Sequence, residues 1–181
     1  RCFWAATAED YRDYHDTEWG RPVHGDSALL ERIVLEGFQS GLSWLTILRK
    51  RPAFRSAFAD FDPAAVAGFD QSDVERLLGD AGIVRHRRKI EAAITNAEAT
   101  VHLAERDGPG ALDRLVWAHA PQRPRPAPSR VSDLPAQTTQ SAALATSLKA
   151  EGFVFVGPTT AYATMQACGL VNDHLVGCAF R

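Results

Sequence analysis

The sequence predicts an all-α fold. Apolar residues recur at the three- and four-residue spacing of a helix over most of the 181 residues. The only strand-like run is 153–156, which is bounded by glycines and is too short to define a sheet. Glycines, prolines and N-cap residue types divide the rest of the chain into segments of helical length.

The first long helix is expected to begin at Asp26 and Ser27, which are both favourable N-cap types. Its apolar positions continue at helical spacing through Phe38. Gly41 interrupts the pattern, because glycine is a poor helix former in the middle of a helix. We therefore expect a break in the chain around position 41.

A second helix is expected over 44–50, with Ser43 as its N-cap. Pro52 either ends this helix or starts the next turn, because proline lacks the backbone N–H that a helix interior needs. Ser72 and Glu75 have the spacing of a capping box, which indicates another helix start.

The second half of the chain continues the helical pattern. Further helices are expected over 85–104, 111–118, 141–149 and 160–168. Between Pro121 and Pro128 four of eight residues are proline, which predicts a stiff connector outside the helices. The sequence contains no internal repeat of useful length.

Composition indicates one globular domain over 1–181 in a reducing compartment, which we expect to be the cytoplasm. Of the residues, 45% are apolar and three are cysteine, so the chain needs no disulfide scaffold. Its apolar runs are shorter than the roughly 18 residues that cross a bilayer, and we expect no membrane partner. The N-terminus begins Arg1-Cys2-Phe3-Trp4 and then turns polar, unlike a signal or transit peptide. We expect a monomer.

A glycine turn between two helical segments lies in front of a basic cluster. Gly82 marks the turn, and Arg85, Arg87 and Arg88 follow it at the start of the next helix. A helix N-terminus with free N–H groups and basic side chains can hold a DNA phosphate. A helix-hairpin-helix near 73–95 fits this pattern, and so does an ordinary helical hairpin with a solvated basic face.

Two cysteines and two histidines near the chain ends have the chemistry of a zinc site. His174 and Cys178 are four residues apart, which would put both on one face of a helix. Cys2 and His15 are too far apart for a zinc-finger knuckle, so the four residues could equally be unrelated. Cys168, the third cysteine, is expected in the core.

Aromatic residues are dense near the N-terminus, where they could enclose an extruded base or simply pack in the core. They are Phe3, Trp4, Tyr11, Tyr14, Trp19 and, further on, Trp44. Glu36 lies within an apolar run, on the polar side of its helix or facing a pocket. In a pocket it would be a buried acceptor, which is costly without a partner.

Several blocks taken together resemble one family. These blocks are 2–4, 14–20, 35–44, 80–86 and 165–174, and the match runs in order from Cys2 to Cys178. Together they make the chain similar to the constitutive bacterial 3-methyladenine DNA glycosylases of type I, which belong to the helix-hairpin-helix glycosylase superfamily.

The resemblance implies roles for residues of this chain. It implies a zinc ion bound by Cys2, His15, His174 and Cys178, one per chain and structural. It implies base recognition by Glu36 in a pocket walled by Tyr14 and Trp44, with Trp4 and Tyr11 nearby. The Gly41-Leu42 turn resembles the element that enters the duplex where the base has left. Phe38 departs from the family, where this position is often polar, and could alter packing behind the pocket.

The function implied is excision of 3-methyladenine from alkylated double-stranded DNA, without a strand-cleaving lyase step. The alternative is a non-enzymatic helix-hairpin-helix DNA-binding protein with a structural zinc. A catalytic zinc is disfavoured, because four protein ligands leave no open coordination position.

Overall fold

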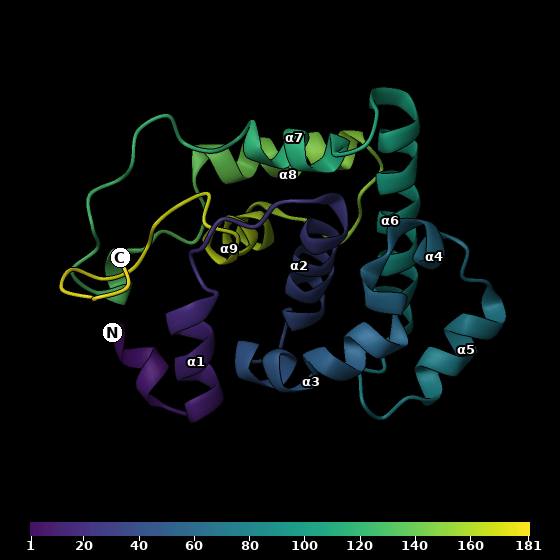
Figure 1. The fold of residues 1–181 in the computed structure, drawn as a ribbon, viewed down its shortest axis with the longest axis horizontal. Helices are drawn as coiled ribbons and strands as arrows, with labels where there is room; N and C mark the ends of the chain where they lie inside the picture. Colours follow the sequence, from purple (N-terminus) through teal and green to yellow (C-terminus); the bar gives the residue numbers. More distant parts are fainter.

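The computed structural model describes residues 1–181 and is entirely helical, which confirms the all-α prediction (Figure 1). Three of its elements are short 3-10 helices: η1 (Phe3–Ala6), η2 (Ala59–Phe61) and η3 (Val131–Asp133). The others are α1 (Glu9–Thr17), α2 (Asp26–Gln39), α3 (Trp44–Ala57), α4 (Pro63–Ala67), α5 (Gln71–Gly79), α6 (Arg87–Asp107), α7 (Ala111–Trp117), α8 (Thr139–Ala150) and α9 (Pro158–Ala167).

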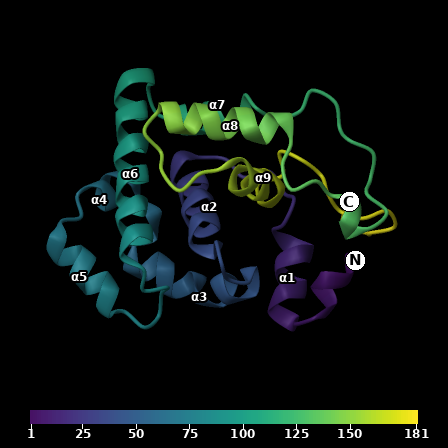
Figure 2. The same cartoon turned by 180° about the vertical axis from the view of Figure 1, so that it is seen from behind.

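Helix α2 is the centre of the fold. Every residue from Leu29 to Phe38 is buried, including the glutamates and the arginine of this stretch. The helix lies between α9 and α6 in both views (Figures 1 and 2), and it packs against both. A continuous cluster of 38 buried apolar residues surrounds it. Removing this surface from water is the main favourable term of folding.

Helix α2 begins where the sequence predicts, but its cap is different. The N-cap is Gly25, and Asp26 is already inside the first turn. The Asp26 carboxylate instead accepts hydrogen bonds from the backbone N–H groups of Gly110 and Asp113, both at 3.0 Å. It therefore satisfies the start of α7, whose free N–H groups need an acceptor.

The predictions for the next two helix boundaries were partly wrong. Ser43 does cap α3, accepting from the Thr46 N–H at 3.2 Å, but α3 continues through Pro52 to Ala57. Tertiary packing of the α3 face that contains Phe54 outweighs the hydrogen bond lost at the proline. The N-cap of α5 is Asp70, not Ser72, and its carboxylate accepts from Ser72 N–H at 2.7 Å.

The strand-like run 153–156 forms a loop and no sheet, as its length predicts. The side-chain amide of Asn96 on α6 satisfies the backbone N–H and C=O of Val154, which would pair with a neighbouring strand in a sheet. It accepts from Val154 N–H at 2.8 Å and donates to Val154 C=O at 3.2 Å. Phe155 adopts a positive φ of 56° in this loop.

The glycine turn between α5 and α6 is tightly packed. A Cβ at Gly82 would lie 2.9 Å from the Cβ of Ala53, so α3 can approach the turn only because this residue is glycine. Lys50 of α3 donates to the carbonyls of Ala81 and Gly82 at 2.9 and 3.2 Å. These contacts hold the turn against the body of the protein.

The two ends of the chain lie side by side at one end of the molecule, beside α1 (Figures 1 and 2). The Cys2 N–H lies 3.4 Å from His15 Nε2, and the Leu175 N–H lies 3.4 Å from the sulfur of Cys2. None of the helices combines the length and apolar character that a membrane span requires.

Candidate functional site: an aromatic pocket and a Cys/His cluster

A pocket of about 240 Å³ opens between the N-terminal helices and α9. All five residues that the sequence predicts for base recognition line it, from η1, α1, α2 and α3. The lining consists of Trp4, Tyr11, Tyr14, Trp19, Glu36, Gln39, Trp44, Val131, Leu134, Ala163 and Gln166. Phe3 is 66% exposed and lies outside this pocket.

The one carboxyl group in the pocket wall belongs to Glu36. Its side chain is buried, 6% exposed, and burial raises its pKa to about 8. No protein hydrogen bond stabilises its charge, and the positive charge of Arg32, one turn earlier on α2, only partly offsets the burial. The pocket therefore contains an acceptor whose partners are missing, which is costly unless a ligand supplies them.

Aromatic rings surround this carboxyl group. Tyr14 and Trp44 are 5.5 Å apart between centroids and tilted by 44°. The ring centroid of Trp4 lies 4.8 Å from that of Tyr11 and 5.2 Å from that of Trp19. The indole Nε1 of Trp44 is buried without a hydrogen-bond partner. The rings present π-faces that suit a flat, cationic ligand.

A half-buried ion-pair network lies beside Tyr14 and supports the pocket. Arg51 of α3 binds Glu18 through two hydrogen bonds of 2.6 Å, and its guanidinium lies 5.9 Å from the centre of the Tyr14 ring. Arg32 donates to the same Glu18 at 3.1 Å. Bidentate pairing fixes the orientation of the groups. The network therefore holds α1, α2 and α3 in register around Tyr14.

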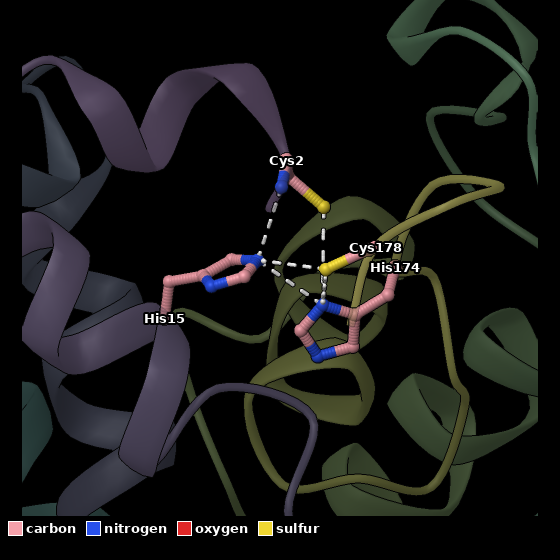
Figure 3. Close-up of side chains that lie close together, drawn as sticks. All are labelled: Cys2, His15, His174 and Cys178. Atoms are coloured by element: carbon pink, nitrogen blue, oxygen red, sulfur yellow. Dashed lines mark hydrogen bonds between the residues drawn. The ribbon is translucent and has the colours of Figure 1, made fainter. Parts of the chain in front are cut away.

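Cys2, His15, His174 and Cys178 form a buried cluster (Figure 3). Their ligand atoms all lie within 4.8 Å of one another. His15 Nε2 lies 3.2 Å from His174 Nδ1, and Cys178 Sγ lies 3.5 and 3.4 Å from these nitrogens. Tetrahedral zinc bonds require about 3.3 Å between two nitrogens and about 3.6 Å between nitrogen and sulfur. The donor set and its spacing fit a zinc ion.

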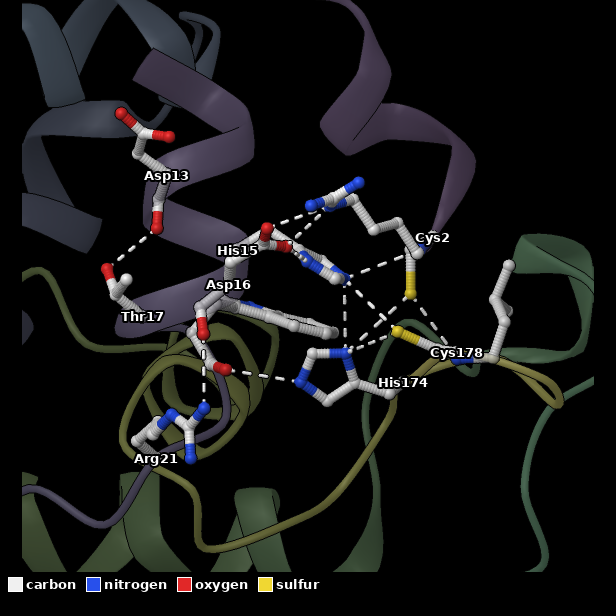
Figure 4. A network of polar contacts seen from close by, with 11 residues as sticks. Cys2, Asp13, His15, Asp16, Thr17, Arg21, His174 and Cys178 are labelled. Atoms are coloured by element: carbon white, nitrogen blue, oxygen red, sulfur yellow. Dashed lines mark hydrogen bonds and ion pairs between the residues drawn. The ribbon is translucent and has the colours of Figure 1, made fainter. Parts of the chain in front are cut away.

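The outer nitrogens of both histidines are held by neighbouring groups (Figure 4). His15 Nδ1 bonds Asp16 at 2.8 Å, and His174 Nε2 donates to the Trp19 carbonyl at 3.2 Å. Such partners fix the ring and tautomer of a metal-ligating histidine. Burial lowers the pKa of His174, which favours the neutral imidazole that binds metals.

The helix predicted for His174 and Cys178 is wrong. Residues 172–175 have no regular secondary structure and 176–177 and 179–180 form turns, so the two side chains converge through the loop and not along a helix face. Gly169, at a φ of 74°, starts this reversal after α9. A Cβ there would lie 2.6 Å from the Arg21 backbone, so the approach of this segment to the N-terminal region depends on glycine.

The residues predicted to contact DNA lie at the ends of α2 and α5 and the start of α6. Gly41 has a φ of 85°, and Leu42 beside it is 42% exposed. Arg85, Arg87 and Arg88 are exposed. Arg87 is paired with Glu75 at 2.6 Å, and the guanidinium of Arg88 lies over the ring of Phe155.

A family model described as methyladenine glycosylase matches residues 4–181 of this chain. The chain belongs to the methyladenine glycosylase family. The DNA-3-methyladenine glycosylase 1 of Escherichia coli (strain K12) is 48% identical over 179 residues, covering 98% of this chain and 95% of that protein. The Haemophilus influenzae DNA-3-methyladenine glycosylase is 43% identical over 181 residues, covering 98% and 96%.

Solved structures of other methyladenine glycosylases share this fold. A crystal structure of 3-methyladenine DNA glycosylase I superposes with a TM-score of 0.92 at 46% identity, covering 99% of this chain and 98% of that one. The Staphylococcus aureus enzyme, whose structure concerns 3-methyladenine recognition, gives a TM-score of 0.91 at 33% identity. It covers 99% of this chain and 95% of its own.

Sequence reasoning missed part of this glycosylase pocket. Gln166 donates from its side-chain amide to Asp173 at 2.9 Å, so its orientation is fixed where it lines the pocket. Leu134 reaches the pocket from the long connector, which no local pattern predicts. Phe38 does not line the pocket; it packs on Phe54 at 4.7 Å in the core. Phe38 therefore belongs to the core side of α2.

Proposed function

We propose that this protein is a monofunctional DNA glycosylase that excises 3-methyladenine from alkylated double-stranded DNA. The observation that carries the proposal is the unpartnered, buried carboxyl of Glu36 among the aromatic rings that line the pocket. Relatives at 43–48% identity carry the same activity in their names. We further propose that it acts as a monomer in the cytoplasm, on the chromosomal DNA of a bacterium.

The reaction needs little acid–base help from the protein. The methylated adenine is positively charged, so the C1′–N9 bond breaks with its electron pair moving to the base, which leaves neutral. Water adds to the resulting oxocarbenium carbon and loses a proton, which gives an abasic sugar. Glu36 accepts hydrogen bonds from the adenine edge, while Tyr14 and Trp44 stack on the cationic ring. Neutral adenine gains less from this pocket.

We propose that Cys2, His15, His174 and Cys178 hold one structural zinc ion. The spacing of the donors and their outer partners support this assignment. A zinc there would join residues 2 and 178, closing nearly the whole chain, where loop-closure entropy is largest. All four positions are protein ligands, so the ion would stabilise the fold without activating water.

We propose that α5, its glycine turn and α6 form a helix-hairpin-helix that holds the DNA backbone, while Leu42 enters the duplex. Replacing both Arg87 and Arg88 by alanine should weaken binding to every duplex sequence alike. The slope of log K against log salt should fall by about 1.8, since each lost phosphate contact contributes about 0.9. Fluorescence anisotropy over a salt series measures this slope.

The matched control for this double variant is Arg106→Ala. Arg106 lies in the last turn of α6, about 30 Å from the hairpin, so its loss should leave the salt slope unchanged. A changed sequence preference with an unchanged slope in the double variant would contradict phosphate contact. Binding of free 3-methyladenine should be unaffected in both variants.

The experiment that tests the proposed function is incubation of the protein with methylated duplex DNA. Chromatography of the released material should show free 3-methyladenine, and denaturing gels should show intact strands until alkali is added. Immediate strand cleavage would contradict the absence of a lyase step. DNA binding without any base release would support the alternative, a non-enzymatic helix-hairpin-helix protein.

A further inference from the structure

The buried side chain of Lys89 lies at an unusual place in its helix. It is the third residue of α6 and only 9% exposed. A cation in the first turn is opposed by the positive end of its own helix dipole. Burial also lowers the pKa of its ammonium group. A charge kept there needs compensating partners outside α6.

Those partners are the carbonyl groups at the end of α2. Lys89 Nζ donates to the carbonyls of Phe38 at 2.9 Å and Ser40 at 2.7 Å. Carbonyls at a helix C-terminus have no partner within the helix and carry its negative end. The ammonium of one helix therefore caps the C-terminus of another.

These two carbonyls flank the turn that exposes Leu42. Leu42 N–H donates back to the Gln39 carbonyl at 2.6 Å, and Gly41 supplies the positive φ between them. No other side-chain hydrogen bond to the carbonyls of residues 38–40 exists in the structure. Lys89 thus connects the exposed turn directly to the helix that carries Arg87 and Arg88.

We propose that Lys89 is a positioning residue for base excision. By fixing the 39–42 turn to the start of α6, it makes the grip of the hairpin on the DNA backbone determine where Leu42 enters the duplex. The inference rests on the proposed function, because it requires both a hairpin bound to phosphates and a side chain that fills the vacated space.

The base pocket does not need this contact. Of the lining residues, only Gln39 lies in the 39–42 turn; Glu36 lies within the body of α2, and the aromatic walls come from η1, α1, α3 and the segment that follows α1. Loss of Lys89 should therefore separate two properties that a general structural defect would change together: insertion into DNA, and binding of the free base.

The test compares wild type, Lys89→Met and the control Lys149→Met. Lys149 is an exposed lysine of α8 whose side chain makes no hydrogen bond or ion pair, so its variant removes the same charge away from the site. We expect single-turnover excision at saturating enzyme to fall by about 10- to 100-fold in Lys89→Met, since small misplacements cost this much. Lys149→Met should match wild type.

Two further readouts separate positioning from a structural role. A duplex with 2-aminopurine beside a tetrahydrofuran abasic analogue reports insertion, and Lys89→Met should lose most of the fluorescence change seen with wild type. Binding of free 3-methyladenine, followed by tryptophan fluorescence, should stay within about twofold of wild type, because Glu36 and the aromatic walls lie outside the 39–42 turn.

Several results would contradict a positioning role for Lys89. Wild-type excision and insertion in Lys89→Met would overturn the proposal, and so would parallel loss of free-base binding. If Lys89→Met does not fold, Lys89→Gln, which keeps an uncharged amide donor group, should show the same separation at smaller amplitude; its absence there would also overturn the proposal. Failure of wild type to excise the base would instead contradict the proposed function.

Discussion

Glu36→Ala is expected to lose excision of 3-methyladenine by about one to two orders of magnitude, since each charge-assisted hydrogen bond lost contributes roughly 1.5–3 kcal/mol. The Glu36 carboxyl group has no hydrogen-bond partner in the protein, so its oxygens are available to accept from the ligand. Glu36→Gln keeps one acceptor and should retain more activity than alanine. Single-turnover release of the base from methylated duplex DNA measures both variants.

The control for these variants is Glu98→Gln, which removes the charge of an exposed glutamate on α6 away from the pocket. It should excise the base at the wild-type rate. If Glu36→Ala excises normally but unfolds more readily, Glu36 is a structural residue and the pocket is misassigned.

The raised pKa of Glu36 also predicts how stability and activity depend on pH. Between pH 4.5 and 8 the folded state keeps a proton that the unfolded state has released, so stability conferred by the proton is lost as pH rises through this window. Glu36→Gln has no such loss. Its free energy of unfolding at pH 8 should exceed that of the wild type by a few kcal/mol, on the order of the free energy that corresponds to the raised pKa of Glu36. Urea denaturation at pH 5 and 8 measures the difference.

Excision should follow the ionised fraction of Glu36. The second-order rate constant of the wild type should rise about tenfold per pH unit below pH 8, because the carboxylate is the form that binds a cationic base. Glu36→Gln should show no such rise. A wild-type profile that is flat from pH 6 to 9 would contradict a buried, unpartnered carboxyl group as the recognition residue.

Cys178→Ser should lose bound zinc and lower the melting temperature by more than about 5 °C, because metal binding contributes directly to folding free energy. The substitution leaves three of the four buried donors, which is an incomplete zinc site. Plasma mass spectrometry and thermal unfolding measure the two effects. Free 3-methyladenine binding at 20 °C should change little.

Cys168→Ala is the matched control, since Cys168 is buried but lies outside the cluster. It should keep one zinc per chain, although a smaller side chain in the core will cost some stability. A fully stable wild type that contains no metal would contradict the structural zinc.

The sequence predicted most helices because their apolar spacing is a local property. Boundaries failed where distant contacts decided them: Asp26 caps α7 instead of its own helix, and Pro52 is carried inside α3. The pocket residues could be predicted from the family motifs that contain them. Their spacing along the sequence did not indicate that they would converge. Gln166 and the Glu18–Arg51 pair were missed, since their roles depend on contacts between elements far apart in the chain.

The most direct test of the recognition pocket is titration of free 3-methyladenine into the wild type and Glu36→Gln, followed by tryptophan fluorescence. Trp44, Trp4 and Trp19 line the pocket and should report the ligand. We predict saturable binding to the wild type, binding weaker by about tenfold in Glu36→Gln, from one lost charged hydrogen bond, and no measurable binding of unmodified adenine. Equal affinity of both proteins for 3-methyladenine, or equal affinity of the wild type for adenine, would contradict the account.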